Sequence, residues 1–350
     1  MNFASDNAGP AHPAVWDAMA RADRGHAMPY GNDPLTRDVV ERLRALFAVP
    51  DAAVALVATG TAANSLALAC LCPPWGRIYC HADAHIEQDE GGAPEFFIGG
   101  GKLTLLSGEQ GRFTSETLHD AIAAADRSVH AVQPSVVSIS NLSEAGTVWS
   151  LDAIREVVEI AHGAGMQVHL DGARLANALV ALDASPSDLM AIGLDAIVFG
   201  GTKNGLPGVE AVILRDGTKA EELARRRKRG GHLFSKHRYL AAQFDAYLTD
   251  NLWHDLAGRA NAAARRLSEG LVAAGADLLH PTDGNEIFCR FPRAVHQRLH
   301  TEGARYYLWP DAPLEGDAAE MLGARLVCNW STTQAEIDGL LAAFRGEGAA

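Results

Sequence analysis

The sequence predicts an α/β fold, in which a large, mostly parallel sheet is followed by a smaller α+β unit. Between residues 50 and 215, short apolar runs alternate with helical stretches, a pattern typical of parallel sheets covered by helices on both faces. After residue 216, successive helical patterns replace this alternation. Ligands of such sheets collect at the carboxyl ends of the strands. We therefore expect the functional side chains at that edge.

The large unit is expected to contain seven strands with helices between them. Apolar runs of strand length predict strands at Ala53–Ala58, Arg77–Cys80, Leu103–Leu106, Val136–Ser140, Met166–Leu170, Ala196–Phe199 and Val209–Leu214. Apolar residues at helical spacing predict helices at Thr61–Leu71, Ser115–Ala125 and Leu151–Ala161.

The second part of the chain is expected to begin with helices and to end in a small α+β unit. Helices are predicted at Glu221–Lys228, Phe234–Leu256 and Arg259–Ala274. They are followed by a strand at Glu286–Phe291, a helix at Ala294–Thr301, a strand at Arg325–Trp330 and a helix at Gln334–Phe344. The change in pattern predicts two domains, 1–250 and 251–350.

Charge and composition favour a metabolic enzyme over a nucleic-acid binder. The 350 residues contain 30 Lys and Arg against 43 Asp and Glu, and the formal charge is −13. This balance opposes binding to a phosphate backbone. The basic run Arg225–Arg229 falls in a helical stretch of this acidic chain, so we interpret it as a solvated face or a subunit contact.

The cysteines and the N-terminus indicate a cytoplasmic protein. The five cysteines are odd in number, lie in apolar surroundings and form no C-x-x-C pair, which favours neither disulfides nor zinc. The first residues do not resemble a signal peptide, and no apolar run reaches the roughly 18 residues of a membrane span. We therefore expect a reducing cytoplasm and no membrane partner.

The strongest functional segment is Phe199–Gly205, FGGTKNG, directly after a predicted strand. Its Lys203 stands in a glycine-rich bend at the carboxyl end of that strand. A lysine in this position faces a cleft and can form a Schiff base with a carbonyl cofactor. On this segment alone, a surface lysine in a loop is an equally good interpretation.

The preceding βα unit favours the cofactor interpretation. The segment Val168–Arg174 is an apolar strand that ends in Asp171. Pyridoxal phosphate needs an anion beside its pyridine nitrogen, because the protonated ring withdraws electrons more strongly. Asp171 can supply this anion, and Arg174 can approach the cofactor or a substrate carboxylate. The alternative is that Asp171 only caps the next helix.

Two further segments complete the expected pocket. Thr59–Asn64 connects a strand to a helix, and the N–H groups of Gly60 and Thr61 can hold a phosphate there. The segment 81–90, HADAHIEQDE, follows another strand. Within it we prefer His85 to His81 for stacking on the pyridine ring and for proton transfer. The cluster also resembles a metal site, but the predicted chemistry needs no metal and we predict none.

Together these segments resemble the threonine aldolase branch of the aspartate-aminotransferase-like (fold type I) pyridoxal-phosphate enzymes. The resemblance covers nearly the whole chain and includes motifs outside the segments above. In order, the motifs are Ser5–Asn7, Tyr30–Pro34, TGTAAN, AHIEQDEGGAPE, HLDGARL, FGGTKNG and Ala324–Val327. GTKNG and GGAPE are similar in particular to the low-specificity L-threonine aldolases of bacteria.

The resemblance implies a role for each matching residue. Lys203 would form the Schiff base, with Thr202 beside the cofactor, Asp171 at the pyridine nitrogen, His85 on the ring, and Gly60 and Thr61 at the phosphate. Ser5, Arg174 and Arg325 would bind the substrate's α-carboxylate, and His130 would lie near its β-hydroxyl.

The resemblance also implies a homo-oligomer, expected to be a tetramer whose minimal active unit is a dimer. Tyr30 would be donated across a subunit interface. Many relatives carry GGGMRQ where this chain has GGHLFS at residues 230–235. The contact to a neighbour's phosphate is therefore open, and Lys228 is a candidate for it.

The implied reaction is reversible aldol cleavage of L-threonine, L-allo-threonine or a related β-hydroxy-α-amino acid such as phenylserine, to glycine and an aldehyde. His85, directly or through water, would take the β-hydroxyl proton. Another pyridoxal-phosphate reaction, β-elimination or racemisation, is the first alternative. A binding protein without cofactor is the second. The motifs do not determine which β-substituent is preferred.

Overall fold

The seven predicted strands form one sheet in the computed structural model, which describes residues 1–347. The strand order is β1-β7-β6-β5-β4-β2-β3. The bounds are β1 Ala53–Val57, β2 Gly76–His81, β3 Lys102–Leu106, β4 Gln133–Ser140, β5 Gln167–Asp171, β6 Ala196–Gly200 and β7 Glu210–Leu214. β2 to β6 pair in parallel, whereas β7 runs antiparallel to both β1 and β6. The predicted α/β fold with a mostly parallel sheet is confirmed.

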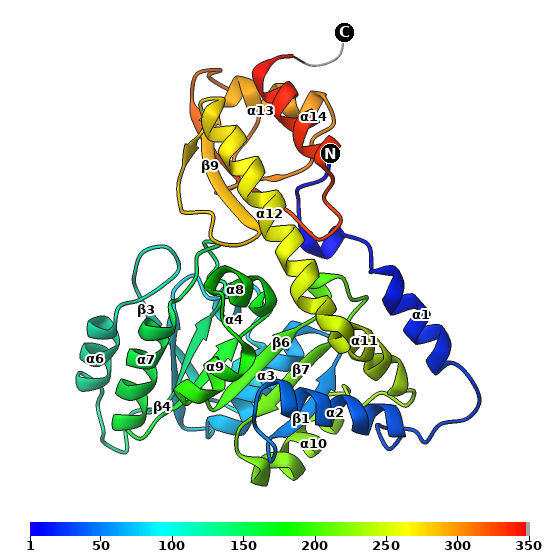
Figure 1. Cartoon of the computed structure of the whole chain (residues 1–350). Helices are drawn as coiled ribbons and strands as arrows, with labels where there is room; N and C mark the ends of the chain where they lie inside the picture. Colours follow the sequence, from blue (N-terminus) through cyan, green and yellow to red (C-terminus); the bar gives the residue numbers. More distant parts are fainter. Residues whose placement is uncertain (348–350) are drawn as a thin grey trace.

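Successive residues of a strand point to opposite faces of this sheet, and each face is buried under its own layer of helices. One face packs on α3 (Gly60–Leu71), α5 (Ala93–Ile98) and α10 (Ala220–Arg229). The opposite face is covered by α2 (Pro34–Leu46), α6 (Ser115–Ala123), α7 (Leu151–Gly163), α8 (Leu175–Leu182), α9 (Pro186–Ile192) and α11 (Arg238–Leu248). The sheet therefore lies between two helical layers (Figure 1), which leaves only its edges for binding.

A second sheet forms the smaller unit near the C-terminus. Its order is β10-β11-β9-β8, and all its pairs are antiparallel. The strands are β8 Asp277–Leu278, β9 Glu286–Pro292, β10 Tyr307–Leu308 and β11 Met321–Val327. They pack against α12 (Leu252–Ala273), α13 (Arg293–Thr301) and α14 (Gln334–Arg345). The long helix α12 runs from the large unit up to this sheet (Figure 1).

The N-terminal segment connects the two units. Phe3 is fully buried in the core of the small unit, and its N–H group donates to the carbonyl of Arg305 at 2.7 Å. Asp6 begins a short helical turn (Asp6–Ala8) at the junction, and α1 (Pro13–Ala22) then packs on α11. The division at residue 250 remains a prediction, but the first residues belong to the core of the small unit.

Two predicted elements differ from the structure. The continuous helix expected over Phe234–Leu256 is broken, because Asp250 and Asn251 adopt left-handed φ angles of 51° and 54° between α11 and α12. The strand expected over Arg325–Trp330 lies earlier, and β11 ends at Val327. Beyond it, the side chain of Trp330 donates to the carbonyl of Pro10 at 2.8 Å. Among the described residues, no helix has the length and apolar character to cross a bilayer.

Candidate active site

A cavity of about 620 Å³ opens between the carboxyl edge of the large sheet and the small unit. The large unit contributes His85, Glu144, Arg174 and Lys203 to its walls. The small unit contributes Glu286, Phe288, Tyr307, Trp309 and Arg325, and the N-terminal segment contributes Ser5. A smaller recess adjoins the cavity, lined by Asp171 together with His85, Arg174 and Lys203. The structure thus brings together six of the twelve predicted residues, which are Ser5, His85, Asp171, Arg174, Lys203 and Arg325.

Lys203 is held in a tightly bonded turn after β6. Gly201 donates its N–H group to the buried Glu210 carboxylate at 2.8 Å, and a Cβ at Gly201 would lie 2.4 Å from Leu206. The side chain of Asn204 donates to the Tyr247 hydroxyl at 2.7 Å and to the Trp253 carbonyl at 2.8 Å. Because the residues on both sides of Lys203 are fixed, its amine is presented to the cavity.

A chain of buried polar groups runs from Asp171 to His85. The side chain of Asn64 donates to Asp171 Oδ2 and to Glu90 Oε1, each at 2.8 Å. Glu90 Oε1 also lies 2.9 Å from His85 Nδ1. The hydrogen bond to Glu90 raises the pKa of His85, more than its partial burial lowers it. This arrangement fixes the histidine ring and favours its protonated form.

These hydrogen-bonded groups include a cluster that resembles a metal site. His85, Glu90 and Asp171 offer ligand atoms within 4.8 Å of one another. Asn64 already donates to both carboxylates, and the backbone N–H of Ala173 donates to Asp171 Oδ1 at 3.0 Å. These bonds fit a carboxylate held to face a bound ring nitrogen. His81 lies elsewhere, buried and bonded to the backbone of Gly108 and Asp83.

The predicted phosphate turn begins helix α3. The Thr59 side chain accepts the N–H of Ala62 at 3.2 Å and thereby caps the helix. Gly60 and Thr61 are the first residues of the helix, and a Cβ added at Gly60 would meet no atom within 4 Å. The helix start therefore has space for an anion beside its N–H groups. Gly60, Thr61 and Thr202 do not line the cavity or the recess.

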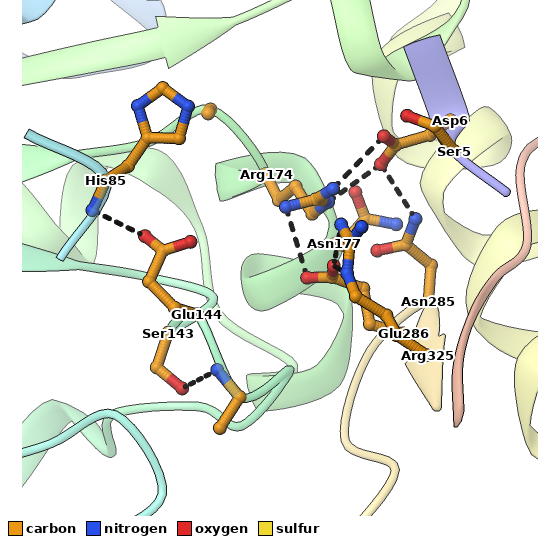
Figure 2. Close-up of polar contacts among 12 residues, drawn as sticks. Ser5, Asp6, His85, Ser143, Glu144, Arg174, Asn177, Asn285, Glu286 and Arg325 are labelled. Atoms are coloured by element: carbon orange, nitrogen blue, oxygen red, sulfur yellow. Dashed lines mark hydrogen bonds and ion pairs between the residues drawn. The ribbon is translucent and has the colours of Figure 1, made fainter. Parts of the chain in front are cut away.

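Two arginines reach the cavity, and both are paired with buried acids (Figure 2). Arg174 donates from Nε to Asp6 Oδ2 at 2.7 Å and from Nη2 to Asp6 Oδ1 at 3.1 Å. Its Nη1 lies 3.1 Å from Glu286 Oε2. Arg325 donates to Glu286 Oε1 at 2.9 Å. Although burial lowers the pKa of Arg174, Asp6 and Glu286 raise it overall. Arg174 and Arg325 are therefore fixed on one wall of the cavity, where their two positive charges are matched by the carboxylates of Asp6 and Glu286.

The comparisons with known proteins agree with this geometry. The family model of the beta-eliminating lyases matches residues 2–293. A low-specificity L-threonine aldolase of Pseudomonas aeruginosa is 39% identical over 333 residues, which cover 94% of this chain and 93% of that protein. This chain belongs to the threonine aldolase group of the beta-eliminating lyase family.

A second relative and a solved structure extend the match across the whole length. A low-specificity L-threonine aldolase of a Pseudomonas strain is 36% identical over 98% of this chain and 96% of its own. The threonine aldolase of Leishmania major superposes with a TM-score of 0.90 at 28% identity, covering 99% of each chain. The predicted family and the fold type I architecture are confirmed, and the family is one of carbon–carbon lyases.

One residue predicted from the aldolase resemblance is misplaced. His130 is exposed, in the turn that precedes β4. The cavity lies at the opposite end of that strand, and eight strand residues span roughly 25 Å. His130 therefore cannot reach a substrate in the cavity of its own chain. In its place, the loop after β4 brings Glu144 to the cavity wall.

Tyr30 and Lys228 lie together, but not on the cavity. The Lys228 amine stands over the Tyr30 ring, 5.3 Å from its centroid. Tyr30 is 43% exposed and has a left-handed φ of 61°. Neither residue lines the cavity. A role of either at a neighbouring subunit's site stays a prediction for this aldolase-group chain.

The sequence motifs do not point to Glu144, Glu286 or the aromatic residues of the small unit that line the cavity. Glu144 follows β4 at the same sheet edge as Asp171 and Lys203, so the strand-end rule could have identified it. Glu286 begins β9, and nothing in the sequence separates it from an ordinary exposed glutamate. It is recognisable only through its ion pairs with Arg174 and Arg325.

Proposed function

We propose that this chain is a pyridoxal-phosphate-dependent aldolase. Its reaction is the reversible cleavage of L-threonine, L-allo-threonine or a related β-hydroxy-α-amino acid to glycine and an aldehyde. The observation that supports this most directly is the convergence of Lys203, His85 and Arg174 on one cavity, with Asp171 in the adjoining recess. The similar proteins of Pseudomonas aeruginosa and Leishmania major are named as a low-specificity L-threonine aldolase and a threonine aldolase.

The residues present fit the proposed cofactor. The Lys203 amine faces the cavity, the Asp171 carboxylate is held by Asn64, and space surrounds Gly60 at the helix start. When bound, pyridoxal phosphate supplies a conjugated cationic ring that disperses negative charge from the substrate's Cα. We assign the amine linkage to Lys203 and the contact to the ring nitrogen to Asp171.

The remaining predicted roles are divided between the cavity wall and the neighbouring turns. His85 faces the ring, Gly60 and Thr61 offer N–H groups to the phosphate, and Thr202 supports the turn of Lys203. Thr202 does so by accepting the Val209 N–H at 3.2 Å. The α-carboxylate of the substrate binds beside Ser5, Arg174 and Arg325, which line one side of the cavity. Fixing the carboxylate there sets which bond at Cα is aligned for cleavage.

We further propose a homo-oligomer, a tetramer with the dimer as the minimal active unit, in a reducing cytoplasm. The exposed Tyr30–Lys228 pair supports a subunit contact near that face. All five cysteines are buried and free, which suits a compartment where thiols stay reduced.

Product analysis tests the proposed activity. The purified protein is incubated with L-threonine, L-allo-threonine and both Cβ epimers of phenylserine. Equal amounts of glycine and aldehyde are expected. Release of ammonia and a 2-oxo acid would instead establish β-elimination, and conversion to the D-isomer would establish racemisation. Lys203→Ala should remove the visible absorbance of the cofactor, and a wild-type protein without such absorbance would exclude pyridoxal phosphate.

A further inference from the structure

Glu144 is a carboxylate in the cavity that no other part of the proposed reaction uses. It lies in the loop between β4 and α7, and lines both the cavity and the recess that holds Asp171. One of its oxygens, Oε1, accepts the backbone N–H of His85 at 3.3 Å. In Figure 2 the carboxylate extends from the loop towards His85, on the far side of the site from the Arg174 cluster.

The loop around Glu144 is rigid. The Ser143 hydroxyl donates to the Gln110 carbonyl at 2.9 Å, and the Thr147 hydroxyl donates to the same carbonyl at 2.9 Å. The backbone N–H of Ser143 donates to the Thr147 carbonyl at 2.8 Å, which closes the loop. A carboxylate on a loop held from both ends is positioned before substrate arrives, as a catalytic group requires.

One ring nitrogen of His85 is already engaged. Its Nδ1 is bonded to Glu90 Oε1 at 2.9 Å, and that bond raises the pKa of the imidazole. A neutral ring that donates from Nδ1 to Glu90 keeps a lone pair on Nε2, whereas the protonated ring has none. Glu90 thus fixes the orientation of His85, and the Glu144 carboxylate beside it is a second group on the cavity that can accept a proton.

The surroundings of Glu144 suit a proton acceptor. Burial raises the pKa of Glu144, and the Asp171 and Glu286 carboxylates raise it further, whereas Lys203 and His85 lower it. The net direction is upward. A carboxylate whose pKa approaches the working pH accepts a proton more readily than one in water. The charged groups that face it are Lys203, His85 and Arg174 as cations and Asp171 and Glu286 as anions.

We propose that Glu144 accepts the proton of the substrate's β-hydroxyl during cleavage and returns it in the reverse direction. The inference rests on the proposed aldolase function. The O–H bond breaks, its proton passes to a Glu144 oxygen, and its electron pair becomes the second bond of the aldehyde carbonyl. The Cα–Cβ bond breaks and its electron pair stays at Cα. One proton from solvent then completes glycine at Cα, and Glu144 releases its proton to solvent.

The test compares two reactions, cleavage of the Cα–Cβ bond of L-threonine and exchange of the Cα proton of glycine. Exchange of the glycine Cα proton with D₂O needs the cofactor, Lys203 and the carboxylate site, but no base at a β-hydroxyl. Glu144→Gln should lower kcat for L-threonine cleavage by about 10²- to 10⁴-fold, the usual contribution of a general base. Glycine exchange, followed by NMR, should stay within about threefold of wild type, since one carboxylate-to-amide change leaves the loop bonds of Ser143 and Thr147 intact.

Further measurements distinguish a loss of catalysis from a loss of folding stability. Unfolding of the Glu144→Gln apoprotein by urea should show a free energy no lower than that of wild type, because a partly desolvated carboxylate is removed. Glu144→Asp should recover part of the cleavage rate. The exposed Glu109, in the loop between β3 and α6, provides a matched control. The Glu109→Gln variant should cleave L-threonine and exchange the glycine proton like wild type.

Two outcomes would overturn the role of Glu144, and a third would overturn the proposed function. Cleavage by Glu144→Gln within about threefold of wild type overturns the proposal, since a general base contributes far more. Parallel loss of cleavage and glycine exchange also overturns it, because the residue would then support the cofactor site as a whole. If wild type exchanges glycine but releases no aldehyde from any β-hydroxy amino acid, the proposed function fails instead.

Discussion

Glu90 Oε1 lies 2.9 Å from His85 Nδ1 and 2.8 Å from the side-chain nitrogen of Asn64, which also bonds Asp171. The carboxylate therefore connects the residue proposed to face the cofactor ring with the residue proposed to bind its nitrogen. Such an outer carboxylate fixes the orientation and the protonation state of a histidine.

Glu90→Gln should lower the pKa of His85 while keeping the fold. The amide oxygen can still accept from Nδ1, but the negative charge that stabilises the imidazolium is lost, and such charge-assisted bonds are worth roughly 1.5–3 kcal/mol. The pKa of His85 is measured by NMR titration of labelled histidine, assigned with His85→Asn. Glu87→Gln, on the same short helix as His85, is the control. An unchanged His85 titration in Glu90→Gln would disprove the coupling.

Asp6→Asn should destabilise the junction between the two units. Burial raises the pKa of Asp6, but Arg174 and Lys203 lower it by more, so the net shift is downward. Removing one partner of a buried ion pair typically costs about 3–5 kcal/mol. Because the folded pKa is depressed, this stabilisation is present above the unfolded pKa and is lost as the pH falls through the folded one. Urea unfolding should show a large deficit at pH 7 that shrinks towards pH 3.

Much of the fold follows from local patterns. The central strands β6 and β7 are nearly continuous apolar runs, because both faces of the sheet are buried there, and this makes them visible in sequence. Ligands of such sheets bind at the carboxyl ends of the strands, and this rule predicted correctly that Asp171 and Lys203 lie close to the same recess. The break at Asp250 and Asn251 was missed because neither glycine nor proline marks it.

The candidate site is harder to predict where it depends on tertiary contacts. His130 was assigned by resemblance alone, and its place at the wrong end of β4 became apparent only from the topology. Glu286 is separated from Arg174 by more than a hundred residues, and only folding joins them at 3.1 Å. Likewise, Phe288 and Trp309 meet the cavity through the pairing of the small sheet, which no local pattern announces.

Three aromatic side chains line the cavity, Phe288, Tyr307 and Trp309, and this aromatic wall predicts a preference for large β-substituents. Trp309 is 51% exposed, and its ring lies 6.3 Å from that of Phe288, with the Arg325 guanidinium 5.9 Å from the Trp309 ring centroid. An aromatic substituent gains about 0.5–1.5 kcal/mol from such neighbours. Trp309→Ala should therefore raise KM for phenylserine about two- to tenfold and leave KM for L-threonine nearly unchanged.

Steady-state kinetics with both substrates measures this difference. Trp75→Ala is the matched control, since Trp75 is 66% exposed just before β2, at the edge of the sheet away from the cavity. Equal changes in KM for phenylserine and L-threonine in Trp309→Ala would show that the wall does not contact the β-substituent.

Glu210 should make stability fall as the pH rises. Burial raises its pKa to about 7, although bonds from Thr202 and Gly201 lower it. The folded state therefore binds more protons than the unfolded state between about pH 4.5 and pH 7, and its free energy of unfolding decreases across that range. Glu210→Gln keeps an oxygen to accept the Gly201 N–H and removes the ionisation. The variant should equal wild type at pH 4 and exceed it at pH 8 by on the order of 1–3 kcal/mol. Urea titrations of both proteins at the two pH values measure the gap, and a constant difference would show that Glu210 does not titrate in this window.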